Sequence, residues 1–253
     1  MSDTSHPQSS TPTQRVHVVL AHAGIASRRK AEELVSQGRV HVNGVQASLG
    51  QAVGASDAIA VDGVLIERNP EHFRYFLVNK PTGFVSTVSD EMGRPSVLSL
   101  LPESITRSTR LYPVGRLDID SQGLLVITND GPLTHRLTHP KYTVSKTYDV
   151  QLDRRPSDQA LMHLERGVQL IDGRATPDDL VLLDIPPQGC WFSITVHEGR
   201  NRLVRRMFER VGYEVITLIR TQFGPWSLDT VLQLAGEKPW IELQSADVPQ
   251  FIQ

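Results

Sequence analysis

The sequence predicts an α+β protein: a small helix–helix–hairpin domain, then a larger domain whose mostly antiparallel or mixed β-sheet is flanked by helices. Two helical patterns and two hairpin turns follow one another within residues 15–68. From residue 72 to residue 253, strand and helix patterns alternate irregularly, without repeated β–α–β units. The 253 residues, 39% of them hydrophobic, are enough to form two separate cores.

Two polar segments set the expected domain boundaries. Residues 1–14 consist mainly of Ser, Thr, Pro and Gln and have almost no apolar side chain to bury, so a disordered tail is predicted. Residues 67–71 include Pro70 and are typical of a linker. The sequence therefore predicts a tail over 1–14, a small domain over 15–68 and a large domain over 72–253.

Two helices are predicted in the small domain. Apolar residues at helical spacing begin the first helix, and Gly24 follows where a helix would stop: Val16, Val19, Leu20 and Ala23. Ser27 can cap the second helix, which would end near Gly38 and bury Ala31, Leu34 and Val35.

Two hairpins complete the small domain. Val40–Val42 and Val45 flank Asn43-Gly44, a dipeptide typical of a two-residue β-hairpin turn. Asp62-Gly63 is a second dipeptide of the same kind. Both turns predict short antiparallel strands packed on the two helices.

Three strands and three helices are predicted in the large domain. Short apolar runs at 75–78 and 124–127 are suited to buried strands, and the alternation over 192–196 is typical of a half-buried strand. Helical patterns fall near 131–138, 157–166 and 201–211. Their irregular order favours a mixed sheet over a repeated β–α–β fold.

Basic residues are concentrated locally although the net charge is −2. Arg28, Arg29 and Lys30 occupy the first turn of the second predicted helix, where the helix dipole disfavours cations. A phosphate at that end would be met by backbone N–H groups and by all three side chains. A solvated face is the alternative, but the position favours contact with RNA.

A second basic run covers residues 200–210, with five arginines against Glu209. In a helix, its apolar stripe would comprise Leu203, Val204, Met207, Phe208 and Val211. Arg202 and Arg206 would point away from this stripe, free for solvent or phosphate. Arg205 would border the stripe, and a partly buried Arg needs an anionic partner such as Asp118.

Residues 115–131, GRLDIDSQGLLVITNDG, place Arg116, Asp118 and Asp120 on a loop just before an apolar strand. Loops held by a rigid sheet often carry catalytic groups. Polar turn residues that cap the backbone are the alternative. The residues alone do not decide which Asp would act.

Two other groups of residues are weaker candidates. Tyr148 of Lys146-Thr147-Tyr148 is in most such contexts a sheet residue, but an aromatic face can hold an extruded base. His135 and His139 lie four residues apart, yet no general-base Glu or third ligand accompanies them, so helix packing or an RNA contact is favoured over a metal. Cys190 is the single cysteine, which excludes an internal disulfide.

Two segments resemble known families. Residues 15–64, with LAHAGIASRRKAEELVSQGRVHVNG, resemble the S-four-type RNA-binding domain of ribosomal proteins. GRLDIDSQGLLVITNDG, HRLTHPKYTVSKTYDV and HEGRNRLVRRMFERVG resemble, in order, signature blocks of ribosomal RNA pseudouridine synthases. NKPTGFVST, GPWSL and GEKPW extend this resemblance, which spans about 15–243.

The resemblance implies a role for several residues. Asp118 matches the nucleophile, Arg116 the residue that engages the flipped-out region of RNA, and Tyr148 the aromatic that packs against the target base. Arg205 matches the basic partner of the nucleophile, and Val204 the apolar residue before it. Where relatives often have His, Gln or Glu, this chain has Arg202-Leu203, so nearby RNA contacts differ. The expected RNA-binding residues are Arg28, Arg29, Lys30, Arg200, Arg202 and Arg206.

The implied reaction limits the expected cofactors and partners. Isomerising uridine adds and removes nothing overall, so neither a metal nor a small-molecule cofactor is expected. The expected partner is ribosomal RNA or a pre-ribosomal particle, with the large subunit favoured and the small subunit left open. A cytoplasmic location is expected, since no apolar run approaches the ~20 residues that span a membrane. The sequence does not reveal the oligomeric state, and a monomer is taken as the default.

Three other functions remain as alternatives. A non-catalytic RNA-binding ribosome-assembly factor would keep the basic runs but would not need the GRLD loop. A glycoside hydrolase could use Asp118 with another carboxylate, but would not need the small domain. An RNA methyltransferase would need a glycine-rich cofactor site, which the sequence lacks.

Overall fold

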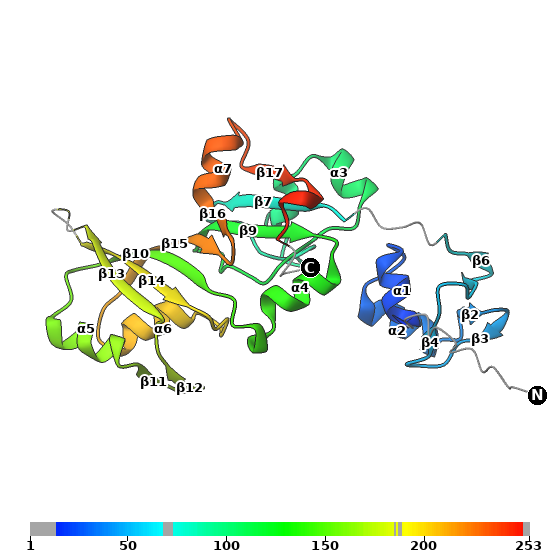
Figure 1. The fold of residues 1–253 in the computed structure, drawn as a ribbon, viewed down its shortest axis with the longest axis horizontal. Helices are drawn as coiled ribbons and strands as arrows, with labels where there is room; N and C mark the ends of the chain where they lie inside the picture. Colours follow the sequence, from blue (N-terminus) through cyan, green and yellow to red (C-terminus); the bar gives the residue numbers. More distant parts are fainter. Residues whose placement is uncertain (1–13, 68–72, 185, 187–188, 250–253) are drawn as a thin grey trace, which may run out of the picture. The chain divides into compact units, whose positions relative to one another are not determined.

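The computed structural model describes residues 14–67, 73–184, 186 and 189–249. The chain divides into two compact units, Met1–His72 and Phe73–Gln253 (Figure 1). The tail expected over 1–14 lies outside the described residues except for Gln14, which belongs to a short strand. The linker expected over 67–71 lies outside them except for Glu67.

The first unit packs two helices on short antiparallel strands. One sheet has the order β3-β2-β5-β6, and β1 pairs with β4. The elements are β1 Gln14–Arg15, α1 Val16–His22, α2 Arg28–Ser36, β2 Val40–Val42, β3 Val45–Gln46, β4 Ala52–Val53, β5 Ile59–Val61 and β6 Val64–Leu65.

Local chemistry explains the ends of these elements. The Ser27 hydroxyl caps α2 by accepting from the Lys30 backbone N–H at 3.2 Å. Asn43 and Gly44 have φ angles of 52° and 78°. A two-residue hairpin turn of type I′ needs a positive φ at both of its central residues, and this pair provides it. The predicted helices and hairpins of this unit are confirmed, and its core contains the predicted apolar residues of both helices except Ala23, which follows the end of α1 and is half-buried.

The second unit is built on a mixed sheet with the order β13-β14-β10-β15-β9-β7-β17. Its pairs are antiparallel except for β15 with β9, so the predicted α+β class is confirmed. β8 pairs with β9, β16 pairs with β15, and β11 and β12 form a separate two-stranded sheet. The strands of this unit are β7 Tyr75–Lys80, β8 Tyr112–Pro113, β9 Gln122–Thr128, β10 Lys146–Leu152, β11 Val168–Leu170, β12 Gly173–Ala175, β13 Asp179–Asp184, β14 Cys190–Val196, β15 Val215–Phe223, β16 Trp226–Ser227 and β17 Trp240–Leu243.

Helices cover this sheet, and three short 3₁₀ turns lie before α3, after α4 and after β17. Three of the helices match the predicted patterns near 131–138, 157–166 and 201–211. The helices are α3 Glu103–Ser108, α4 Gly131–Thr138, α5 Asp158–Glu165, α6 Leu203–Arg210 and α7 Leu228–Leu234, with the 3₁₀ turns η1 Val97–Leu100, η2 Pro140–Tyr142 and η3 Ser245–Asp247.

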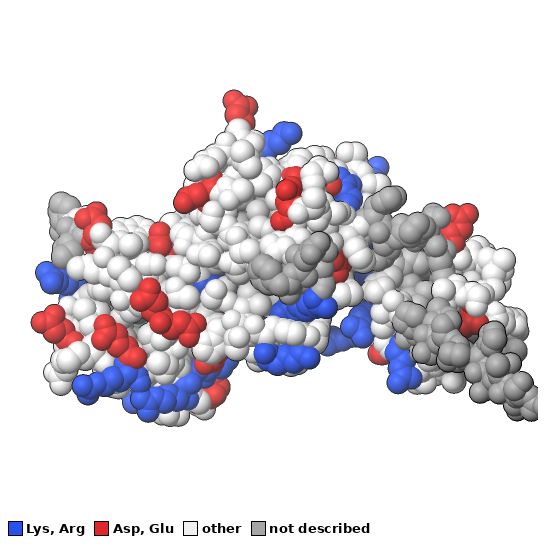
Figure 2. Space-filling view, in the orientation of Figure 1, with Lys and Arg blue, Asp and Glu red and all other residues white. Residues whose placement is uncertain are grey.

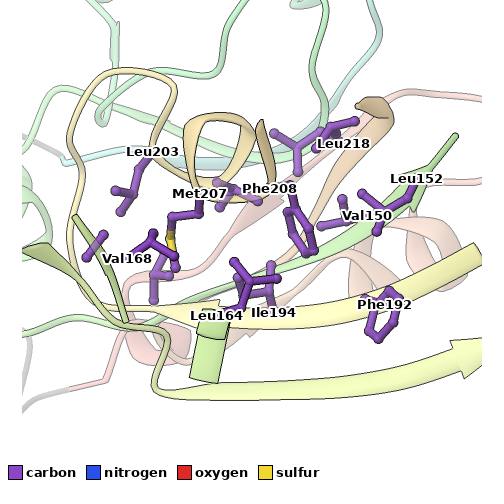
Figure 3. Packing of buried hydrophobic residues seen from close by; sticks show 14 of the residues in the cluster. Val150, Leu152, Leu164, Val168, Phe192, Ile194, Leu203, Met207, Phe208 and Leu218 are labelled. Carbon is purple, nitrogen blue, oxygen red and sulfur yellow. The ribbon is translucent and has the colours of Figure 1, made fainter. Parts of the chain in front are cut away.

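Helix α6 is anchored by its apolar stripe. Met207 and Phe208 are fully buried and pack with side chains of β10 and β14 (Figure 3). The helix begins at Leu203 rather than near 201, because Arg202 has a φ of +48° and ends the preceding turn in the left-handed region. The helical projection therefore describes Arg205 and Arg206 but not Arg202.

Strands β10, β15 and β9 lie side by side at the start of β9, directly after the 115–121 loop. Tyr148 of β10 lies opposite Arg220 of β15, and Arg220 in turn lies beside Gly123 of β9. Gly123 has a φ of +104°, and a Cβ there would lie 2.4 Å from the Arg220 carbonyl oxygen. Only glycine permits this close approach, which brings the 115–121 loop next to β10 and β15. In the described part of the chain, no helix is long and apolar enough to cross a bilayer.

Candidate active site

A pocket opens in the second unit beside the 115–121 loop. Arg116, Asp118, Tyr148 and Val204 all line it, together with Arg200 and Arg202. Three segments distant in sequence thus bring most of the predicted site residues to one place. Its apolar walls include Leu117, Val196, Leu203, Leu218 and Phe223.

Two side chains, Lys80 and Ser86, hold the backbone of the Asp118 loop through hydrogen bonds. The fully buried Lys80 ammonium donates to the carbonyls of Pro81 (3.1 Å), Asp118 (3.0 Å) and Ser121 (2.6 Å). The Ser86 hydroxyl donates to the Leu117 carbonyl at 2.8 Å and accepts from its N–H at 3.1 Å. These bonds fix the loop while the Asp118 side chain stays 31% exposed.

Two buried lysines place positive charge around the pocket. Burial lowers the pKa of Lys80 to about 8, although the Asp120 and Asp118 carboxylates act to raise it. Burial, followed by the Arg220 guanidinium, lowers the pKa of Lys146 to about 8. Lys146 lines the pocket and donates to the carbonyls of Val144 (2.7 Å) and His197 (3.2 Å).

Arg205 was predicted to be partly buried and is more deeply buried than that, with a side chain only 5% exposed; its expected pairing with Asp118 is wrong. Its ion pair is with Asp120, at 3.3 Å between Nη2 and Oδ2. It also donates to the carbonyls of Val215 (2.7 Å) and Asp120 (3.2 Å). The guanidinium is held among backbone carbonyls, and Arg202 is the cation nearer Asp118, at 3.8 Å.

Arg202 and Arg206 were expected to be free for solvent or phosphate, but both are ion-paired, as is Arg200, so that expectation is wrong. Arg206 binds Asp172 through two bonds of 2.9 Å, and Arg200 binds the same carboxylate at 3.0 Å. Arg202 lies 3.2 Å from Asp120. Asp172 lies in the turn between β11 and β12, which packs beside α6 only in the folded chain. The helical pattern of residues 200–210 therefore could not reveal this partner. The role of these arginines in RNA binding stays a prediction; Figure 2 shows lysine and arginine atoms along the edge where β11 and β12 lie.

The basic turn of the first unit is exposed on α2. Arg28, Arg29 and Lys30 all have exposed side chains in its first turn. Lys30 forms an ion pair of 2.8 Å with Glu33, one turn later. Their contact with RNA stays a prediction.

Sequence reasoning missed Lys80, Ser86, Lys146 and Arg220. Lys80 belongs to the polar residues that follow the apolar run 75–78, where the strand was expected to end. Nothing in this pattern indicated that its side chain is completely buried. Arg220 did carry a signal, because it lies two residues after the buried Leu218 on the inward face of β15. Among the described residues, no three His, Cys, Asp or Glu side chains are grouped to hold a metal ion.

Comparisons with known proteins agree with the two-unit division. Residues 74–210 match the family model described as RNA pseudouridylate synthase, and residues 14–59 match the S4 domain. The chain is 46% identical over 214 residues to ribosomal large subunit pseudouridine synthase B of Bacillus subtilis, covering 83% of this chain and 86% of that protein. It is 41% identical to the protein of the same name in Pseudomonas aeruginosa, covering 92% and 61%. A crystal structure of a pseudouridylate synthase superposes with a TM-score of 0.64 at 28% identity, covering 92% and 97%.

Proposed function

Because the chain belongs to the RNA pseudouridylate synthase family, we propose that it converts a uridine of ribosomal RNA to pseudouridine, with Asp118 as the nucleophile. The large subunit is the proposed source of the substrate, because the relatives from Bacillus subtilis and Pseudomonas aeruginosa carry that subunit in their names. The observation that carries the proposal is the presence of Asp118 and Tyr148 in one pocket.

The chemistry needs one carboxylate and a closed place for the detached base. An Asp118 oxygen attacks C1′ of the ribose as the bond from C1′ to N1 breaks, and uracil leaves with the electron pair. The base turns, C5 attacks C1′, and the carboxylate is released. The C5 proton passes to solvent and N1 regains a proton, so atoms and charge balance.

Cations around Asp118 suit this role. The Arg202 guanidinium lies 3.8 Å from its carboxylate, and the Lys80 ammonium lies under the loop, bonded to the Asp118 carbonyl. These cations attract a carboxylate and so help to hold its oxygens in the pocket. Arg205 supports the loop from the Asp120 side rather than pairing with the nucleophile.

The remaining pocket residues suit an extruded base. Tyr148 offers an aromatic ring within the pocket, and Val204 adds an apolar contact. We assign Arg116 to the RNA around the target, since it lines the same pocket. The first unit, which matches the S4 domain, would hold structured RNA through Arg28, Arg29 and Lys30. The proposed partner is ribosomal RNA or its precursor particle, bound by a monomer in the cytoplasm.

Mapping pseudouridine in both ribosomal RNAs from cells that lack the gene tests the proposal. One position in large-subunit RNA should lose its pseudouridine, and the wild-type gene should restore it. Asp118→Asn should not restore it, with a rate lower by on the order of 10³-fold or more. Asp120→Asn, two residues away, should restore it in part. An unchanged map, or restoration by Asp118→Asn, would contradict the assignment.

A further inference from the structure

Three exposed aromatic rings gather at the end of α4, outside the residues that line the pocket. The ring centroids of His135 and His139 lie 4.8 Å apart, and Tyr142 meets them edge to face at 5.9 Å and 6.2 Å. Tyr142 is 39% exposed, and both histidines are exposed as well. We call these three residues the ring cluster.

Backbone contacts, rather than a core, hold the ring cluster in place. The Nδ1 atom of His139 accepts from the Lys141 N–H at 3.2 Å, and the Tyr142 N–H donates to the His139 carbonyl at 3.1 Å. The 3₁₀ turn η2 has no buried residue. The rings therefore contribute little to core packing, and their exposure needs another explanation.

The segment that bears the ring cluster leads from one wall of the pocket to another. Thr138, at the end of α4, lines the pocket, and so does Lys146, at the start of β10. His139 and Tyr142 lie between these two residues along the chain, and His135 lies in α4 three residues before Thr138. The ring cluster is therefore continuous with the rim of the pocket.

The charge of this segment is complementary to RNA. Residues 131–148 contain Arg136, Lys141 and Lys146 but no Asp or Glu. The Lys141 ammonium lies over the Tyr142 ring, 4.6 Å from its centroid. Exposed rings interleaved with cations are typical of surfaces that stack bases and contact their phosphates.

We propose that the ring cluster is a stacking platform for unpaired nucleotides next to the target uridine. The proposal rests on the proposed function, because it assumes that RNA enters the adjacent pocket. Extruding a nucleotide breaks its stacking with its neighbours. Rings at the rim of the pocket would replace part of that lost stacking for a flanking base.

Substitutions at Tyr142 separate stacking from other roles. The dissociation constant for deproteinised ribosomal RNA should rise about tenfold with Tyr142→Leu and stay within about twofold with Tyr142→Phe, since only the first removes the ring. Tyr213→Leu is the control, because Tyr213 also carries a cation over its ring, Arg154 at 4.8 Å, but lies outside the 131–148 segment. An equal loss with Tyr142→Phe, an equal loss with Tyr213→Leu, or no loss with Tyr142→Leu would overturn the platform.

Photo-crosslinking to ribosomal RNA that contains 5-iodouridine gives an independent test, with peptides identified by mass spectrometry. Crosslinks should form at the ring cluster and at residues that line the pocket. Crosslinks at the pocket alone would overturn the platform and leave the proposed function standing. Crosslinks at neither would overturn the proposed function, and the platform with it.

Discussion

At the scale of single residues, two carboxylates on one loop have separate surroundings. Asp118 lines the pocket, whereas Asp120 forms ion pairs with Arg202 and Arg205. Sequence spacing could not separate them, because they lie two residues apart in the same polar loop. The difference comes from Arg205, which is buried beside Asp120.

Arg205 should be far more important for stability than Arg206. Arg205→Met would leave the Val215 and Asp120 carbonyls without their buried donor and would remove one of the two cations paired with the Asp120 carboxylate, so the free energy of unfolding should fall by about 3 kcal/mol. Arg206→Met breaks a more exposed pair with Asp172, and the loss should be about 1 kcal/mol. Urea unfolding of both variants measures the difference, and equal losses would show that burial of Arg205 is not what matters.

At the scale of elements, strand ends hold the loop that carries Asp118. Lys80 at the end of β7 binds the loop backbone, and Gly123 lets β9 approach β15 closely. Each of these two contacts joins residues that are more than 30 positions apart in the sequence. Each can be tested by one substitution with a control.

Lys80 should make the stability depend on pH in a defined window. Its pKa is about 8 in the folded chain and 10.5 as the ordinary value, so the unfolded chain binds more protons between these pH values. Stability should therefore rise with pH across this window. Across this window, the free energy of unfolding of the wild type should rise by about 2–3 kcal/mol relative to that of Lys80→Met, because only the wild type has this titrating group. Urea unfolding at both ends of the window checks the sign, and a constant difference would exclude Lys80 as the source.

Gly123→Ala should be much more harmful than substitution at an open glycine. The new Cβ would meet the Arg220 backbone at 2.4 Å, so the free energy of unfolding should fall by about 3 kcal/mol or more. Gly83→Ala is the control: Gly83 has a φ of +86° but nothing within 4 Å, and about 1 kcal/mol should be lost. If both variants unfolded at the same denaturant concentration, the close approach would not explain Gly123.

At the scale of the whole molecule, the two units have separate cores and separate proposed roles, RNA binding in the first and the chemical step in the second. The first unit matches the S4 domain and carries Arg28, Arg29 and Lys30, while the second carries the pocket. RNA affinity and chemistry should therefore respond to different substitutions.

Replacing Arg28, Arg29 and Lys30 with Ala should weaken RNA binding without changing the chemical step. Loss of about three phosphate contacts should reduce the slope of log affinity against log salt by about 2–3. The single-turnover rate at saturating RNA should stay within about twofold. Arg107→Ala, an exposed Arg on α3 of the second unit, serves as the control. An unchanged salt slope in the triple variant would mean that this turn does not contact phosphate.

Much of the fold was predictable because its signals are local. Ser27 at a helix start, Asn43-Gly44 in a hairpin and the apolar stripe of α6 each act within a few residues, and the structure confirms all three. The placement of Asp118 on a loop before a strand also followed from local pattern. Helix boundaries were less exact, because Arg202 adopts a left-handed conformation that spacing does not reveal.

The sequence by itself determined the fold class, the helices and hairpins, the burial of Arg205 and the residues that resemble a known family. Only the tertiary structure decided which charges meet. Asp120 rather than Asp118 pairs with Arg205, Asp172 holds Arg200 and Arg206, and Lys80 lies buried under the loop. The physical reason is that amphipathic periodicity specifies which face of an element is buried, whereas an ion pair depends on the distance between side chains of different elements.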